Sequence, residues 1–218
     1  MKRAVHPVYV CLALLMLLPA LQGCFGVALV GATTGVMAVV DRRSIGVQTD
    51  DTAIELKAAT RLSSALKEVS HVNFTSYNRR LLITGEAPSE TVRARIAEEA
   101  RHIENVQEVL NEVVLSGNSS LASRSNDAFI SSKVKARFID ADQFTASHVK
   151  VVTEAGVVFL LGIVSEREAV AATQIASTTR GVLKVVSLLV KESDEEIRRI
   201  ESSIAHSATS TDGAAGGK

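Results

Sequence analysis

An internal repeat of about 65 residues constrains the fold of this chain more than any other feature. Residues 51–115 recur as residues 127–191, with positions 76 or 77 apart matching in character. Self-similarity at a fixed spacing indicates that one supersecondary unit has been used twice. We therefore expect two related units, joined by a linker at residues 116–125, rather than one large domain.

Each copy of the repeat begins with an amphipathic helix. Apolar residues at helical spacing predict it. They are Ile54, Ala58, Leu62 and Ala65 in the first copy, and Ile130, Val134, Phe138 and Ala141 in the second. In the second copy we expect this helix from Asp127 to about Ile139.

The remainder of each copy predicts two strands, a helix and a last strand. Paired short strands are expected at 72–77 and 81–85, and at 149–154 and 158–162, with turns at Asn78 and Gly156. Second helices follow the start signals at 88–90 and 165–168, and final strands follow at 106–115 and 182–190. The fold class is α+β, in which each unit is a three-stranded mixed sheet with two helices on one face.

Gly85 and Gly162 occupy equivalent positions at the end of the second predicted strand. We interpret them as structural glycines, because the backbone must turn tightly there into the next helix. A contact with a ligand is the less favoured alternative, since a lone glycine is weak support for a site.

The N-terminus has the layout of an export signal. Lys2 and Arg3 precede an apolar run at 8–18, which is too short for a comfortable membrane span. Leu21-Gln22-Gly23-Cys24 resembles the bacterial lipobox, so we expect a signal peptide at 1–23 and covalent diacylglycerol and an N-acyl chain, such as palmitate, on Cys24. An ordinary signal or an uncleaved membrane anchor is the alternative. Phe25, rather than aspartate, follows the cysteine, which resembles the pattern of lipoproteins sent to the outer membrane.

The segments outside the repeats are expected to be simple. Residues 24–50 contain the lipidated cysteine and a tether that carries no charge before Asp41. Residues 192–218 contain a short helix to about Ala205, which Ser193 and Glu196 would start, and a disordered polar tail.

Composition and motifs argue against several functions. Without residues 1–23 the chain has 22 basic and 24 acidic residues, so nucleic acid is not an expected partner. Cys11 lies in the signal and Cys24 carries lipid, which leaves no thiol for a disulfide, a metal or a nucleophile. Neither a catalytic motif nor a metal-ligand spacing is found, and we expect no enzyme activity and no other cofactor. His71 and His148 recur before matched strands, and we interpret them as exposed loop residues rather than metal ligands.

Two segments carry a family resemblance. Gly85-Glu86-Ala87-Pro88 and the run from Leu160 to Ala169 resemble the BON domain. The whole layout is similar to that of dual-BON outer-membrane lipoproteins. The resemblance implies a non-enzymatic protein anchored by lipid at the periplasmic face of the outer membrane. It further implies a role in envelope integrity, enrichment at sites of cell division, and binding of anionic phospholipid, such as phosphatidylglycerol, by the second BON domain.

In that family the lipid surface is centred on the first helix of the second unit. Here Phe129, Lys133 and Arg137 follow one another at i, i+4 and i+8 beside the predicted core stripe. With Val134 and Lys135 they form the lipid-binding set that the resemblance implies; enteric members of the family have tryptophan where this chain has Phe129. A solvated helix face, with Phe129 partly buried on the neighbouring unit, is the alternative. The matching residues of the first unit are Ala53, Lys57 and Arg61, which supply charge without an apolar side chain, so we expect one lipid-binding unit.

A second function remains open at this point. The two units could present sheet or helix faces to envelope proteins, such as the β-barrel assembly complex or activators of cell-wall amidases. The two hypotheses differ in one observable, because only a lipid-binding module would bind anionic liposomes without a protein partner.

Overall fold

The computed structural model describes residues 41–117 and 119–213 of the chain. The predicted signal peptide, Cys24 and most of the predicted tether lie outside these residues. The described residues belong to one compact unit, and the buried clusters described below all lie within it.

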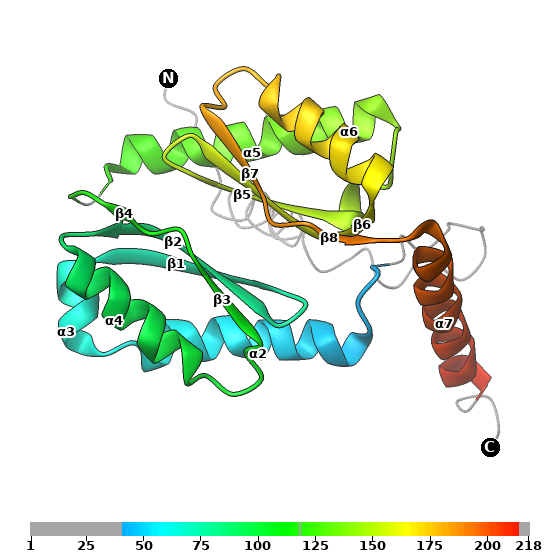
Figure 1. Ribbon diagram of the computed structural model, residues 1–218, viewed down its shortest axis with the longest axis horizontal. Helices are drawn as coiled ribbons and strands as arrows, with labels where there is room; N and C mark the ends of the chain where they lie inside the picture. The colour runs from blue at the N-terminus through cyan, green and yellow to red at the C-terminus, as the bar shows by residue number, and fades with distance from the viewer. Residues whose placement is uncertain (1–40, 118, 214–218) are drawn as a thin grey trace, which may run out of the picture. The chain divides into compact units, whose positions relative to one another are not determined.

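The two repeats have the same order of elements (Figure 1). The first unit contains α2 (Ile45–Arg61), α3 (Ser64–Val69), β1 (His71–Tyr77), β2 (Arg80–Ala87), α4 (Glu90–Arg101), β3 (Glu108–Asn111) and β4 (Val114–Leu115). The second unit contains α5 (Leu121–Ala141), the 3₁₀ turn η2 (Ala146–His148), β5 (Val149–Glu154), β6 (Val157–Ser165), α6 (Glu166–Ser177), β7 (Lys184–Ser187) and β8 (Val190–Glu192). The helix α7 (Asp194–Gly213) follows. The predicted α+β class is confirmed. The predicted order within each repeat also holds, except that the first unit has a second helix, α3, where the periodicity predicted one continuous helix, and Leu66 rather than Ala65 is the buried residue there.

Each unit has a four-stranded mixed sheet, not the three-stranded sheet that we predicted. In the first sheet β1 pairs antiparallel with β2, and β3 and β4 both pair parallel with β2. The second sheet repeats this pattern with β5, β6, β7 and β8. In each unit the last strand is interrupted, because the side chain at the interruption, Val113 or Leu189, packs into the core of its own unit. The rest of the strand then pairs with the far end of β2 or β6.

Two helices begin earlier than the periodicity predicted. Ser44 and Ser120 are the N-caps of α2 and α5. The hydroxyl of Ser44 accepts a hydrogen bond from the Val47 N–H, and that of Ser120 accepts one from the Ser123 N–H. The predicted tether to residue 50 and linker to residue 125 therefore both contain the first turns of a helix. At the C-terminus, α7 continues to Gly213, beyond the predicted end near Ala205 and into the predicted disordered tail.

Three buried clusters hold the described residues together. One lies between α2, α3, α4 and the first sheet, and a second lies between α5, α6 and the second sheet. The third contains residues of both units and of α7: Tyr77, Leu82, Phe159, Leu161, Ile163 and Ile197. Because successive side chains of a strand point to opposite faces, Leu82 faces away from the core that its neighbours Leu81 and Ile83 enter. The sheet faces without helices therefore contribute to one shared core.

The two repeated glycines lie inside strands β2 and β6, not at strand ends as we predicted. A Cβ atom on Gly85 would lie 2.1 Å from the His71 carbonyl oxygen, and one on Gly162 would lie 2.3 Å from that of His148. Both glycines are thus structural, but for a different reason. The neighbouring chain, at the start of β1 in one unit and at the end of η2 in the other, passes too close for any side chain.

Candidate functional site

The candidate surface is the exposed side of α5, and the core determines which of its residues are available. Ile130, Val134 and Phe138 are all buried in the second core. Val134 is 0% exposed and cannot reach a surface, so its inclusion in the lipid-binding set is corrected. Its role is to fix α5 on the sheet.

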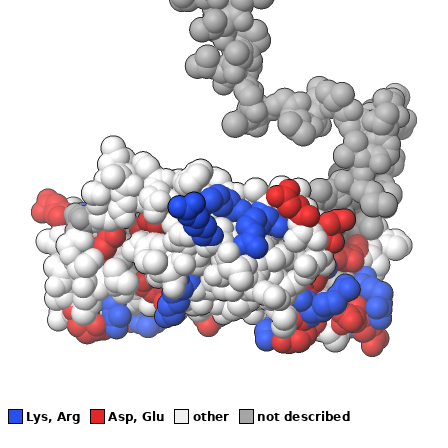
Figure 2. Space-filling view, turned by 90° about the horizontal axis from the view of Figure 1, so that it is seen from above, with Lys and Arg blue, Asp and Glu red and all other residues white. Residues whose placement is uncertain are grey.

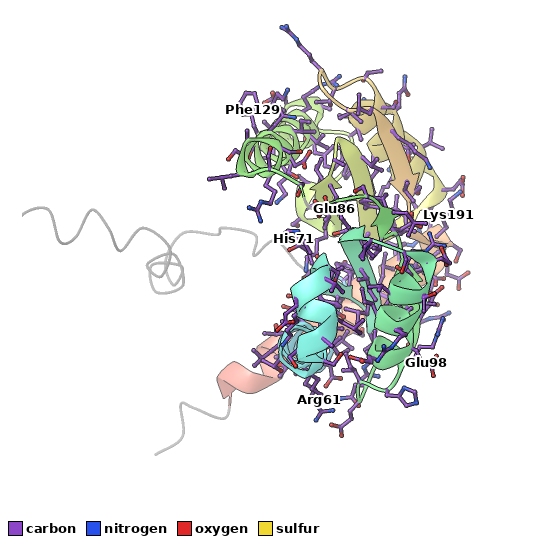
Figure 3. All side chains as sticks on the ribbon, turned by 90° about the vertical axis from the view of Figure 1, so that its left-hand side faces the viewer. Arg61, His71, Glu86, Glu98, Phe129 and Lys191 are labelled. Atoms are coloured by element: carbon purple, nitrogen blue, oxygen red, sulfur yellow. The ribbon has the colours of Figure 1, made fainter. Side chains whose placement is uncertain are left out.

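Phe129 lies on the outer side of α5 (Figure 3). Its side chain is 61% exposed, so the alternative in which it is partly buried against the neighbouring unit does not hold. The Nζ atom of Lys133 lies over the ring, 4.7 Å from its centroid. The same ammonium group donates a hydrogen bond to the carbonyl oxygen of Arg180. An exposed aromatic ring and a half-buried cation therefore form one pair.

Arg137 has a structural role that the sequence did not reveal. Its Nη1 donates hydrogen bonds to the Ile175 carbonyl at 2.8 Å and to the hydroxyls of Thr178 and Thr179 at 3.1 and 2.8 Å. These groups lie at the C-terminal end of α6, where carbonyls lack partners within the helix. Arg137 thus ties α6 to α5, and its charge is only partly available to a ligand.

The exposed side of α5 has few charged side chains, and the exposed acidic one within the helix is Asp140. Leu121 and Ile139 are exposed together with Phe129. At 100° per residue, the centre of this face lies between the flank that contains Lys135 and the flank that contains Lys133. An apolar strip between cations is typical of helices that lie on a membrane surface. Leu121 was missed because the helix was predicted to start after it, and Ile139 because it lies outside the aligned stripe.

Seen from the side of α5 and α6, the surface is mostly uncharged, with lysine and arginine atoms gathered near its middle (Figure 2). Lys135 is exposed. It lines an open hollow of about 370 Å³ together with Ile139 and Lys150. Lys150 is engaged elsewhere, because its Nζ lies 2.9 Å from Glu55 Oε1.

The matching helix of the first unit differs in charge more than in apolarity. Lys57 forms an ion pair of 2.8 Å with Glu104, so its charge is compensated. Ala53 is half-buried and Arg61 is exposed. Leu56 is 65% exposed, so this helix does present an apolar side chain. The lack of one on α2 therefore cannot explain why only the second unit would bind lipid.

Asp51 and Asp127 form a repeated structural device. Asp51 accepts hydrogen bonds from the backbone N–H groups of Asn78 and Arg79, at 2.8 and 2.7 Å. Asp127 accepts them from Ala155 and Gly156, at 2.9 and 2.8 Å. Each carboxylate holds a hairpin turn against the first helix. The sequence could have indicated this arrangement, because aspartate occurs at equivalent positions of both repeats.

The two repeated histidines are not the exposed loop residues that we predicted. His71 begins β1, and His148 is buried at the end of η2. His71 Nδ1 lies 3.4 Å from Glu86 Oε2 (Figure 3), and its Nε2 lies 2.8 Å from Arg124 Nη1 on α5. His148 Nδ1 lies 3.8 Å from Glu168 Oε1. Each histidine contacts a carboxylate on the second strand or second helix of its own unit.

Residues 41–117 and 119–213 contain no group of three or more His, Cys, Asp or Glu side chains that could hold a metal ion. Among the same residues, no helix has the length and hydropathy needed to cross a bilayer.

Comparison with known proteins agrees with the repeat. The family model described as the BON domain matches residues 50–117 and 126–191. "Outer membrane lipoprotein DolP" of Haemophilus influenzae is 36% identical over 170 residues, which cover 77% of this chain and 88% of that protein. The "21 kDa hemolysin" of Actinobacillus pleuropneumoniae is 35% identical over 152 residues, or 69% and 78% of the two chains. The C-terminal domain of CdsD, a type III secretion protein of Chlamydia trachomatis, matches 65% of this chain and 67% of its own, with 15% identity and a TM-score of 0.26.

The family model covers both repeats. The chain belongs to the BON domain family and contains two BON domains, in residues 50–117 and 126–191. It is a dual-BON protein of the DolP type, as the identity over most of both chains shows.

Proposed function

We propose that this protein is an outer-membrane lipoprotein that binds anionic phospholipid through the exposed side of α5 in its second BON domain. The observation that carries the proposal is the exposed ring of Phe129 with the ammonium group of the half-buried Lys133 4.7 Å from its centroid. The lipobox-like sequence at Cys24 and the printed name of the Haemophilus influenzae relative support the location.

The chemistry of the surface suits a bilayer interface. Phe129 would enter the boundary between headgroups and acyl chains, while Lys133 and Lys135 would extend to lipid phosphates on either side of it. Each cation near an anionic leaflet contributes about 1 kcal/mol. That is weak beside the anchoring by acyl chains, so its main effect is to orient a protein already held at the membrane, and a free fragment binds through it at high lipid concentration.

Arg137 contributes less than the sequence pattern implied, because three hydrogen bonds commit it to the end of α6. The surface therefore depends mainly on Phe129 and the two lysines. By orienting the protein on anionic patches of the membrane, it would support envelope integrity and enrichment at division sites without any enzymatic step.

The experiment is sedimentation of the fragment from Asp41 onward with liposomes that contain or lack phosphatidylglycerol. Phe129→Glu and Lys133→Glu are each expected to reduce binding to anionic liposomes at least tenfold. The first removes the apolar contact and adds a negative charge, and the second replaces a positive charge with a negative one. The matched control is Lys57→Glu on α2, which should bind as the wild type does. A wild-type fragment that ignores phosphatidylglycerol would contradict the proposal and favour a protein-protein adaptor.

A further inference from the structure

The segment 180–184, which leads from the loop after α6 into the first residue of β7, exposes an apolar side chain between two cations. Leu183 is 80% exposed, the largest value among the large hydrophobic residues of the described chain. Arg180 and Lys184, on either side of it, are exposed as well. A single exposed leucine is ordinary on a protein surface, so its neighbourhood must decide whether it matters.

The position of Leu183 is fixed by the hairpin turn below it. Its backbone N–H donates a hydrogen bond of 2.9 Å to the Gly156 carbonyl. A Cβ atom on Gly156 would lie 2.8 Å from Leu183 Cδ1, so the leucine side chain rests directly on the turn between β5 and β6. The hydrogen bond and this contact together fix the position of Leu183 on the second sheet.

The same loop adjoins the candidate lipid surface. A Cβ atom on Gly181 would lie 3.3 Å from Ile130 Cγ1 and 3.4 Å from Lys133 Nζ on α5. Lys133 donates its hydrogen bond to the Arg180 carbonyl and also lies over the ring of Phe129. One side chain therefore contacts both the aromatic residue and the loop. In Figure 1 the turn into β7 lies beside α5.

The first BON domain supplies an internal comparison, because its loop has the same backbone geometry. Gln107 N–H donates a 2.9 Å hydrogen bond to the Arg79 carbonyl, as Leu183 does to Gly156. The sheet registers Arg80 with Glu108 and Val157 with Lys184. Asn105 and Gly181, which directly precede Val106 and Val182, both have positive φ, at 70° and 101°. The two loops can therefore be superposed residue by residue.

At equivalent positions the two loops have opposite charge. Residues 104–108 are Glu-Asn-Val-Gln-Glu, and residues 180–184 are Arg-Gly-Val-Leu-Lys. Glu104 compensates Lys57 through a 2.8 Å ion pair, whereas at the equivalent place Arg180 offers Lys133 only a carbonyl and adds a positive charge. Beside α2 the loop would repel an anionic bilayer, although Leu56 is exposed there.

We propose that residues 180–184 are a second membrane-contacting element, in which Leu183 inserts beside Phe129 while Arg180 and Lys184 bind lipid phosphates. The charge of this loop, more than the apolarity of the helix, determines that the second BON domain and not the first binds the membrane. This inference rests on the function proposed above. The partner is an anionic bilayer surface, because an apolar side chain between two cations matches the boundary between acyl chains and phosphates.

The first test uses the absence of tryptophan from the chain. Leu183→Trp, in the fragment from Asp41 onward, gives a single fluorescent reporter, and Phe129→Trp gives a matched one on α5. Both are expected to shift to shorter wavelength with vesicles that contain phosphatidylglycerol, and neither with purely zwitterionic vesicles. A shift at position 129 without a shift at 183 would place the loop in water and overturn the inference alone.

The second test measures affinity. Leu183→Gln installs the residue that the first BON domain has at this position, and it is expected to weaken binding to anionic vesicles by about three- to tenfold, as the loss of one inserted leucine implies. The control is Val170→Gln, which removes an exposed apolar residue of α6 and should leave binding unchanged. Equal binding by Leu183→Gln and the wild type would contradict the inference. No binding by the wild type would instead contradict the proposed function.

Discussion

The guanidinium group of Arg42 lies on the carboxylate of Glu168, with Nη1 2.7 Å from Oε2 and Nη2 3.1 Å from Oε1. Arg42 precedes the first BON domain, yet it is buried against the second, where it also donates to the Ile163 carbonyl and to Glu201 on α7. The next residue, Arg43, binds Asp51 of the first domain at 2.8 Å. Two consecutive arginines thus connect both domains and α7.

Arg42→Ala should strongly destabilise the fragment from Asp41 onward. The substitution leaves the Glu168 carboxylate buried without its cation, which costs about 3–5 kcal/mol in comparable sites. The measurement is urea-induced unfolding at neutral pH. Arg199→Ala is the control, because its pair with Glu196 is exposed, and it should change the unfolding free energy by less than about 1 kcal/mol. Equal effects of the two substitutions would contradict the structural role of Arg42.

The same pair should make stability fall in acid. Burial by itself would raise the pKa of Glu168, but the hydrogen bonds from Arg42 and Ser165 and the charge of Arg42 outweigh it, so the pKa lies below its ordinary value of 4.5. A lowered pKa means that the stabilisation is present above about 4.5 and is lost as the pH falls further. Glu168→Gln should therefore be less stable at neutral pH and lose less stability between neutral pH and pH 3. If the variant lost as much stability as the wild type over this pH range, Glu168 would not be the cause of the acid sensitivity.

Tyr77 should titrate at unusually high pH. Burial in the core shared by both domains, followed by the charge of Asp41, raises its pKa to about 12. It is the single tyrosine of the fragment from Asp41 onward, since the other is Tyr9, so absorbance at about 295 nm reports it alone. The stabilisation is complete below the unfolded value of about 10 and is lost as the pH rises toward 12. A midpoint near 10 in the folded protein would show that the shared core is open to solvent.

Gly162→Ala should destabilise the second domain by more than about 3 kcal/mol, because its Cβ would lie 2.3 Å from the His148 carbonyl oxygen and strand β5 would have to move. Gly117→Ala is the matched control, with nothing within 4 Å of the added atom. Thermal unfolding separates the two. A Gly162→Ala variant as stable as the control would show that β5 and β6 do not approach so closely.

The repeat was sufficient to predict the order of the elements, because periodicity and turn residues act locally. The N-caps Ser44 and Ser120 were also visible in the sequence, but they precede the first periodic apolar residues and were assigned to the tether and linker. The sequence also contained an indication of the core that the two domains share. The run from Val157 to Leu161 is apolar on both faces, which is typical of a strand buried on both sides.

The site was less predictable than the fold. Phe129 and Lys133 follow from helical spacing, and their exposure follows once the core stripe is known. Arg137 fits the same spacing, but its partners on α6 are 38 to 42 residues away, and no local pattern reveals them. The loop around Leu183 could be recognised only after strand register had aligned it with Gln107.

The proposed function requires that the second BON domain contacts the membrane and that the first does not. Both cysteines of the chain precede Asp41, so a nitroxide can be attached to the fragment at one chosen site. Ala136→Cys on α5 and Thr60→Cys on α2 occupy matched exposed positions, 76 residues apart.

Electron paramagnetic resonance of the two labels, with oxygen and a water-soluble nickel complex as relaxing agents, measures their immersion in vesicles that contain phosphatidylglycerol. We expect the label at position 136 to lose accessibility to nickel and gain accessibility to oxygen, and the label at position 60 to remain as in water. Equal immersion of both labels, or of neither, would contradict the assignment of membrane binding to the second domain.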